Sequence, residues 1–89
     1  MSRQSRAALI CERFRKLAPS IIGEKAMDHV QTKFFKRGVL YISVPNSMWA
    51  QHVYVRRHDL IMKLNLNLEK DWVEDIRAHV GHTILEEEI

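Results

Sequence analysis

Positively charged side chains occur in groups along this sequence, and phosphate binding is the chemistry that they suit. Lys33, Lys36 and Arg37 lie close together, and Arg56 and Arg57 are adjacent. A further group precedes them and consists of Arg3, Arg6, Arg13, Arg15 and Lys16. Contacts from lysine and arginine to phosphates supply affinity without sequence choice and make binding depend on salt. These groups therefore predict a face that binds a polyanion.

The distribution of charge along the chain supports this prediction. Residues 1–63 hold twelve Lys or Arg and four Asp or Glu, whereas residues 64–89 hold two basic and seven acidic residues. The net charge of the whole chain is only +3. Such asymmetry is typical of a basic surface for a polyanion with an acidic end directed elsewhere. A solvated surface with uneven charge is the plain alternative.

Other site chemistries find little support in the sequence. His52 and His58 are six residues apart, a spacing that does not bring both to one helical face as metal ligands. Cys11 has no base near it in the sequence to activate a thiolate. Glu74 and Asp75 point to opposite faces of a strand and cannot act together on one bond. We therefore expect no enzyme, no cofactor and no metal.

The hydrophobic spacing predicts six elements that would position these side chains. Apolar residues recur every three or four positions in the segments expected to be helical and alternate in those expected to be strands. The expected helices span 5–18, 19–29 and 47–68, and the expected strands span 30–36, 39–44 and 72–80. This order predicts an α+β fold in which helices cover one face of a small three-stranded sheet. In the third strand the inward set is Trp72, Glu74, Ile76, Ala78 and Val80, and the outward set is Val73, Asp75, Arg77 and His79.

Three aromatic residues could either stabilise this fold or contact a ligand. Trp49 shares the apolar stripe of the helix at 47–68, so we expect a core anchor of low exposure rather than a platform for a base or a partner. Phe35 and Tyr41 have the parity opposite to the apolar faces of their strands, which makes them the better candidates for base stacking. Alternatively, both rings pack under the N-terminal helix.

Length and hydropathy limit the architecture. Eighty-nine residues suit one domain, expected at 1–81, followed by a short acidic tail at 82–89. No apolar run approaches the ~20 residues that cross a bilayer, so we expect a cytoplasmic protein without membrane contact. An open strand edge, or an exposed face around Val39 and Tyr41, could permit dimerisation.

Several motifs resemble those of the DciA family of bacterial replicative-helicase loaders. The motifs are "IIG" at 21–23, "GVLYISV" at 38–44, "SMWAQHV" at 47–53, "KLN" at 63–65 and "VEDIR" at 73–77. The resemblance covers about residues 17–81 and implies a KH-like fold, DNA binding and contact with a DnaB-type replicative helicase. Family members often carry a long flexible C-terminal extension, in the place where this chain has its short acidic tail. The chain lacks the G-x-x-G loop with which KH domains clamp a nucleic-acid backbone.

We therefore predict a non-enzymatic, KH-like module that binds single-stranded or forked DNA and helps to recruit the helicase. A regulatory or protein-interaction module with the same fold, and a KH-like RNA-binding protein, are the alternatives. The candidate nucleic-acid-binding residues are Arg13, Lys33, Lys36, Arg37, Tyr41, Arg56, Arg57 and Lys63.

Overall fold

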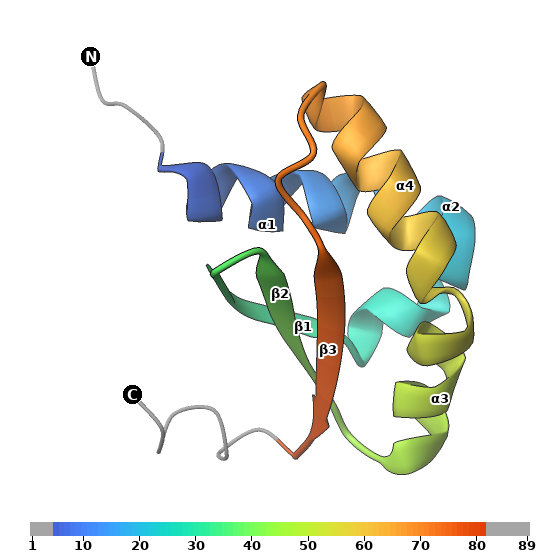
Figure 1. Ribbon diagram of the computed structural model, residues 1–89. Coiled ribbons are helices and arrows are strands. Elements are labelled where there is room, and N and C mark those ends of the chain that lie inside the picture. Colours follow the sequence, from blue (N-terminus) through green and yellow to red (C-terminus); the bar gives the residue numbers. More distant parts are fainter. Residues whose placement is uncertain (1–4, 82–89) are drawn as a thin grey trace.

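The computed structural model describes residues 5–81, which form helices on a small sheet (Figure 1). The predicted acidic tail at 82–89 lies outside the described residues. The helical elements are α1 (Arg6–Leu17), α2 (Pro19–Ile22), the 3-10 turn η1 (Lys25–Asp28), α3 (Ser47–Val55) and α4 (Arg57–Leu68). The strands are β1 (Gln31–Lys36), β2 (Val39–Val44) and β3 (Asp75–Val80). No helix within 5–81 is long and apolar enough to cross a membrane.

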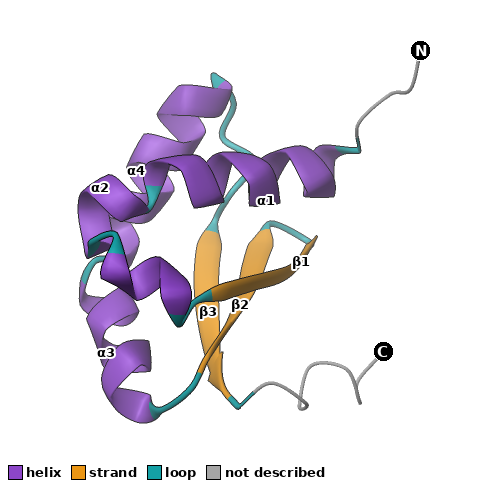
Figure 2. Cartoon of the chain, turned by 180° about the vertical axis from the view of Figure 1, so that it is seen from behind, coloured by secondary structure: helices purple, strands orange, loops and turns teal. Residues whose placement is uncertain are grey.

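The sheet has the order β1-β2-β3 and is mixed. β1 and β2 form an antiparallel hairpin, whereas β3 runs parallel to β2. A parallel neighbour requires a crossover connection, and α3 and α4 supply it. The helices pack on one face of the sheet and beside β3 (Figures 1 and 2). This arrangement confirms the predicted α+β class and leaves β3 at an edge of the sheet.

The core lies between the inner face of the sheet and the apolar stripes of α1 and α4. Ile10 and Phe14 of α1 are fully buried, and Leu60 and Leu64 play the same part in α4. Each pair is separated by four residues, so both side chains lie on one helical face. From the sheet, the alternate residues of β2 meet them, beginning with Leu40. The predicted apolar stripes are thus confirmed for these helices.

The helix predicted at 47–68 is instead two helices that meet at Arg56. Arg56 has φ −108° and ψ 10°, outside the helical region, and its N–H bonds to the carbonyl of Val53. The prediction was wrong because neither glycine nor proline marks the break; the only sign was a gap in the apolar stripe at Arg56 and Arg57. The start was correct, because Asn46 Oδ1 accepts a hydrogen bond from the Trp49 N–H at 3.0 Å and caps α3.

Two further boundaries differ from the prediction. The helix expected at 19–29 is interrupted at Gly23, whose φ of 101° ends α2 before the 3-10 turn begins. The third strand begins at Asp75 rather than at residue 72, so Val73, which was assigned to the outward set, lies in a loop and is buried. At the far end, Val80 has the inward parity but remains 41% exposed.

The β1–β2 hairpin turns at Arg37 and Gly38, as predicted. Both residues have positive φ, 54° and 83°, as in the tight turns whose twist matches that of a hairpin. The Gly38 carbonyl also accepts the N–H of Glu74 at 2.7 Å, which ties the turn to the start of β3. The turn at Arg37 and Gly38 is therefore held next to the start of β3.

Candidate nucleic-acid interface

A groove of about 520 Å³ runs between α3 and the edge strand β3. We call it the α3–β3 groove. The helical side and the first residue of α4 contribute Ser47, Ala50, Gln51, Val53, Tyr54 and Arg57; the strand contributes Asp75, Ile76, Arg77, Ala78 and His79. The groove exists because the break at Arg56 separates α3 from α4 and places the start of α4 opposite the start of β3. It is open to solvent and has two arginines in its wall.

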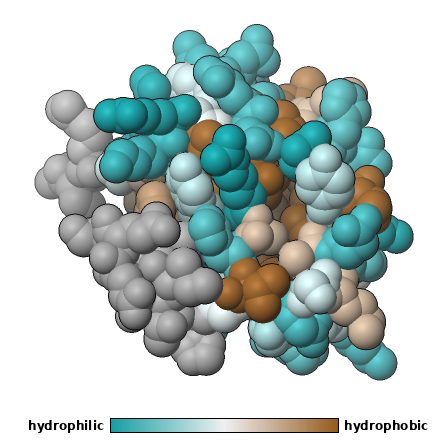
Figure 3. Space-filling view, turned by 60° about the horizontal axis from the view of Figure 1, so that its bottom comes forward, coloured by the Kyte–Doolittle hydropathy of each residue, from teal (hydrophilic) through white to brown (hydrophobic). Residues whose placement is uncertain are grey.

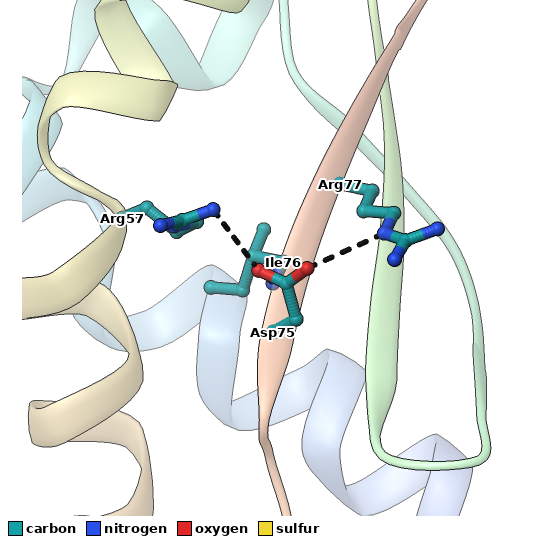
Figure 4. A network of polar contacts seen from close by, with 4 residues as sticks. All are labelled: Arg57, Asp75, Ile76 and Arg77. Atoms are coloured by element: carbon teal, nitrogen blue, oxygen red, sulfur yellow. Dashed lines mark hydrogen bonds and ion pairs between the residues drawn. The ribbon is translucent and has the colours of Figure 1, made fainter.

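These two arginines share one carboxylate (Figure 4). Asp75 Oδ1 lies 3.4 Å from an Arg57 terminal nitrogen, and Asp75 Oδ2 lies 3.3 Å from Arg77 Nε. Asp75 Oδ1 also accepts the backbone N–H of Ile76 at 2.9 Å, which fixes the carboxylate in place. Each guanidinium has five N–H donors, so this network uses only a part of their capacity. The cluster of two positive charges and one negative charge keeps a net positive charge.

Tyr54 adds an aromatic ring to the same groove. The Arg57 guanidinium lies 4.6 Å from the centre of the Tyr54 ring. Stacking of this kind holds the arginine in a defined position and leaves its in-plane donors available. The ring itself is 59% exposed. The groove therefore offers oriented donors together with an apolar surface.

The three predicted hairpin cations lie near the other side of the sheet. Lys36 projects from the end of β1 and is exposed, and Arg37 is exposed in the turn. Lys33 lines a second depression, of about 530 Å³, between α1 and β1, together with Arg15 of α1. We call it the α1–β1 depression. The hairpin cations and the groove arginines thus lie on either side of the sheet rather than in one cluster.

Three other predicted candidates lie on helices. Arg13 donates to Asn67 Oδ1 at 2.7 Å and links α1 to α4. Arg56 contacts His52 Nδ1 at 3.3 Å and donates to the His52 carbonyl at 3.4 Å. Lys63 is exposed on α4. None of the three lines the α3–β3 groove. The acid that pairs with Arg57 is Asp75 of β3.

The aromatic candidates are only partly where the sequence placed them. Tyr41 lies on the face of the sheet away from the helices, as its parity predicted, and stacks on Phe34 with ring centres 4.6 Å apart. Phe35 pairs with Leu40 and packs against the core, so the alternative that its ring packs under the helices is confirmed and its candidate role in base stacking is not. The reason is a bulge at Lys33, which reverses the alternation in the second half of β1.

Trp49 is half-buried rather than of low exposure. Its ring packs against the core, and the exposed ring of His29 stacks on it with centres 4.7 Å apart. The ring of His52 meets it edge-on at 5.6 Å. His52 Nε2 lies 2.9 Å from the Ile22 carbonyl, which joins α3 to α2. The ring anchors α3, as predicted, but keeps one edge accessible.

Cys11 lies on α1 and also lines the α1–β1 depression. Burial raises the pKa of its thiol, and this effect outweighs the nearby Arg15 charge and the hydrogen bond from Thr32, which lower the pKa. A raised pKa leaves little thiolate at neutral pH, and thiolate is the reactive form. Within 5–81, no three His, Cys, Asp or Glu side chains gather closely enough to hold a metal ion.

Four residues of these surfaces were missed by reasoning from the sequence: Tyr54, Arg77, His79 and Phe34. Strand parity carried a signal for two of them, because Arg77 and His79 were assigned to the outward set of the third strand. Their position beside Arg57 depends on the parallel pairing of β3 with β2, which the sequence did not predict. The outward position of Phe34 depends on the bulge at Lys33, and the position of Tyr54 in the groove depends on the helix break at Arg56.

These observations define a class of protein: a small α+β domain with an arginine-lined groove along its edge strand. The family model for "Dna[CI] antecedent, DciA" matches residues 2–78. The chain therefore belongs to the DciA family, whose members load the DnaB-type replicative helicase during DNA replication. No curated protein matches the chain.

Proposed function

We propose that this protein is a non-enzymatic DNA-binding module that helps to bring a DnaB-type replicative helicase to DNA. The observation that carries the proposal is the Arg57–Asp75–Arg77 cluster in the α3–β3 groove, in a chain of a helicase-loader family. Two guanidinium groups with unused donors suit the oxygens of a phosphodiester backbone. DNA bound there would extend across the sheet toward Lys36 and Arg37 of the β1–β2 hairpin.

Phosphate contacts of this type supply most of a protein's affinity for DNA without sequence choice. A loader that acts at many sequences has no need for base-edge recognition. The groove fits this requirement because its polar donors come from long, half-exposed arginines rather than from a deep specific pocket. The cytoplasmic location expected from the sequence is consistent with such a role.

The surface that we assign to the helicase is on α4, away from the groove. Met62 and Leu66 are 57% and 79% exposed, and they lie one helical turn apart. They border a depression of about 450 Å³ that is also lined by Ile61 and by the polar residues Asn65, Glu69, Lys70 and Asp71. The buried residues Leu60 and Leu64 occupy the opposite side of the helix. Exposed large apolar side chains at this spacing are typical of a helix that docks on a protein partner.

A salt titration with a charge-matched control tests DNA binding in the groove. Anisotropy of a labelled single-stranded oligonucleotide would be measured for the wild type, Arg57→Ala and Lys70→Ala at several salt concentrations. Lys70 is exposed beyond α4 and does not line the groove. We expect Arg57→Ala to weaken binding and to reduce the slope of log affinity against log salt by about 0.7, the value for one phosphate contact on a single strand. Lys70→Ala should behave like the wild type.

Two outcomes would overturn the proposal. The first is a folded wild-type protein that does not bind DNA even at low salt. The second is an equal loss of affinity in Arg57→Ala and Lys70→Ala, which would indicate only a general effect of net charge. A parallel titration with RNA of the same sequence determines whether RNA is the preferred ligand.

A further inference from the structure

The face of the sheet opposite the helices carries an unusual set of side chains. A sheet face that is exposed to water is ordinarily polar. Here the pairing of the strands places three rings across it, one from each strand: Phe34 from β1, Tyr41 from β2 and His79 from β3. All three are half-exposed. We call this row the ring row.

The bulge at Lys33 is what turns Phe34 outward. Lys33 has no partner on β2, because Thr32 pairs with Ile42 and Phe34 pairs with the next residue of β2, Tyr41. Without the extra residue, Phe34 would pair with Leu40 and face the core. Bulges commonly re-aim a side chain next to a functional surface. One residue of β1, Lys33, is therefore left unpaired, and the ring of Phe34 lies on the outer face of the sheet.

The geometry of the ring row leaves room for further stacking. The centres of the Phe34 and Tyr41 rings are 4.6 Å apart and the ring planes are 25° from parallel, so one face of each ring stacks on the other ring. Phe34 is only half-buried and also lines the α1–β1 depression. His79 lies 5.9 Å from Tyr41 in a tilted arrangement and continues the row. Rings presented from an open sheet in this way are the means by which several proteins stack unpaired bases.

Positive charges lie at both ends of the ring row. Phe34 borders the α1–β1 depression, which is also lined by Arg15 and Lys33. His79 and Arg77 border the α3–β3 groove at the other end. On the sheet itself, Lys36 and Arg77 share the outer face with the rings. The row thus connects two hollows that each have two basic side chains and one acidic side chain, Glu12 in the α1–β1 depression and Asp75 in the α3–β3 groove.

We propose that the ring row binds unpaired bases of single-stranded nucleic acid by stacking, while the two flanking hollows hold the phosphates. The inference deepens the proposed function, on which it rests, because it assigns selectivity for single strands to a surface distinct from the Arg57 cluster. Bases in a duplex are stacked and paired, so they are not available to the rings.

A nucleic acid suits this surface better than a second copy of the chain does. An isologous contact through the same face would bring the Lys36 and Arg77 side chains of two copies close together, and like charges at an interface are unfavourable. A protein partner would favour a broad apolar area. The ring row instead shares its face with the charged Lys36 and Arg77. In the view of Figure 3, with the bottom of Figure 1 turned forward, brown apolar side chains likewise lie among teal hydrophilic ones. Aromatic rings flanked by cations match the chemistry of bases flanked by phosphates.

Substitutions that keep a large apolar side chain but remove the ring test the proposal. Phe34→Leu and Tyr41→Leu would be compared with Tyr41→Phe, which retains the ring. The probes are a labelled single-stranded oligonucleotide, the corresponding duplex and a single strand that contains 2-aminopurine, whose fluorescence is quenched by stacking. Loss of one stacked base should weaken single-strand binding about tenfold. We expect Tyr41→Phe to bind like the wild type, the salt slope to be unchanged, and duplex binding to be unaffected.

The outcomes separate this inference from the proposed function. If the wild type binds single strands but both leucine variants bind equally well, the ring row is not a stacking surface, although the proposed function stands. If the wild type binds no nucleic acid, the proposed function fails first. An equal loss on single strand and duplex would also refute stacking. Sedimentation that shows a wild-type dimer and a Tyr41→Leu monomer would assign the face to self-association and overturn the proposal. Thermal melts confirm that each variant is folded.

Discussion

Replacing Asp75 by asparagine should make the protein less stable and at the same time improve its binding to DNA. The carboxylate of Asp75 holds Arg57 and Arg77 in place, at 3.4 and 3.3 Å, but it also neutralises part of their charge. Asparagine keeps the shape, and its side-chain oxygen can still accept the Ile76 N–H. The substitution removes the negative charge and, because an NH2 group replaces Oδ2, also the acceptor for Arg77 Nε. Stability and DNA affinity should therefore change in opposite directions.

The sizes of the two effects follow from the exposure of the two ion pairs and from the distance between the Asp75 carboxylate and a bound phosphate. Both ion pairs are partly exposed, and such pairs contribute about 0.5 kcal/mol each, so the expected loss in the free energy of unfolding is about 1 kcal/mol. A phosphate bound by the arginines would lie about 6 Å from the Asp75 carboxylate. Coulomb's law at that distance gives roughly 0.7 to 2.8 kcal/mol of repulsion for an effective dielectric constant between 80 and 20, and salt reduces it. Relief of about 1 kcal/mol corresponds to a roughly fivefold gain in affinity.

Two assays on one preparation test this prediction. Urea denaturation measures the free energy of unfolding, and anisotropy with a single-stranded oligonucleotide measures affinity. Glu69→Gln is the control, because Glu69 is an exposed acid at the end of α4 and is not part of the groove. If Asp75→Asn binds DNA more weakly than the wild type, or if Glu69→Gln gains affinity equally, the arginine cluster is not a phosphate site.

Three further predictions follow from individual residues. Trp49→Ala should lower the free energy of unfolding by about 2–3 kcal/mol in urea denaturation, less than the cost of removing a fully buried ring, because Trp49 is half-buried; full stability would refute its role as an anchor. Iodoacetamide should modify Cys11 more slowly than it modifies the same thiol in the denatured chain, with the pH midpoint of the rate above the ordinary value, because its pKa is raised. The same raised pKa implies that folding stability declines as pH rises through the ordinary thiol pKa, since the unfolded chain releases the proton first. Met62→Ser with Leu66→Ser should weaken capture of a DnaB-type helicase about tenfold and leave DNA affinity unchanged, whereas equal capture would place the helicase contact elsewhere.

The elements of the fold could be predicted because each obeys a local rule. The spacing of Ile10 and Phe14, the alternation along β2, the cap at Asn46 and the turn at Gly38 each depend on neighbouring residues alone. The break at Arg56 could not be predicted, because the residue adopts a common backbone conformation that many sequences tolerate. Tertiary packing of α3 and α4 on different parts of the core decides where that helix ends.

The candidate site was less accessible from the sequence because it depends on long-range pairing. Arg57 was proposed for its charge, but its partner Asp75 comes from a distant strand whose parallel register with β2 is fixed only in three dimensions. The bulge at Lys33 likewise exchanged the roles of Phe34 and Phe35, because one extra residue reverses every side chain after it. Sequence parity therefore placed Tyr41 correctly on the outer face of the sheet and placed Phe35 on the wrong face.

The central claim is that DNA lies along the α3–β3 groove and the outer face of the sheet. The most direct test is a titration of the isotope-labelled protein with single-stranded DNA, followed through the amide signals of each residue by NMR. We expect the largest shifts in β3, at the start of α4 and around Tyr41, and we expect them to decrease as salt is raised. Shifts confined to the exposed face of α4 around Met62 and Leu66 would contradict this claim.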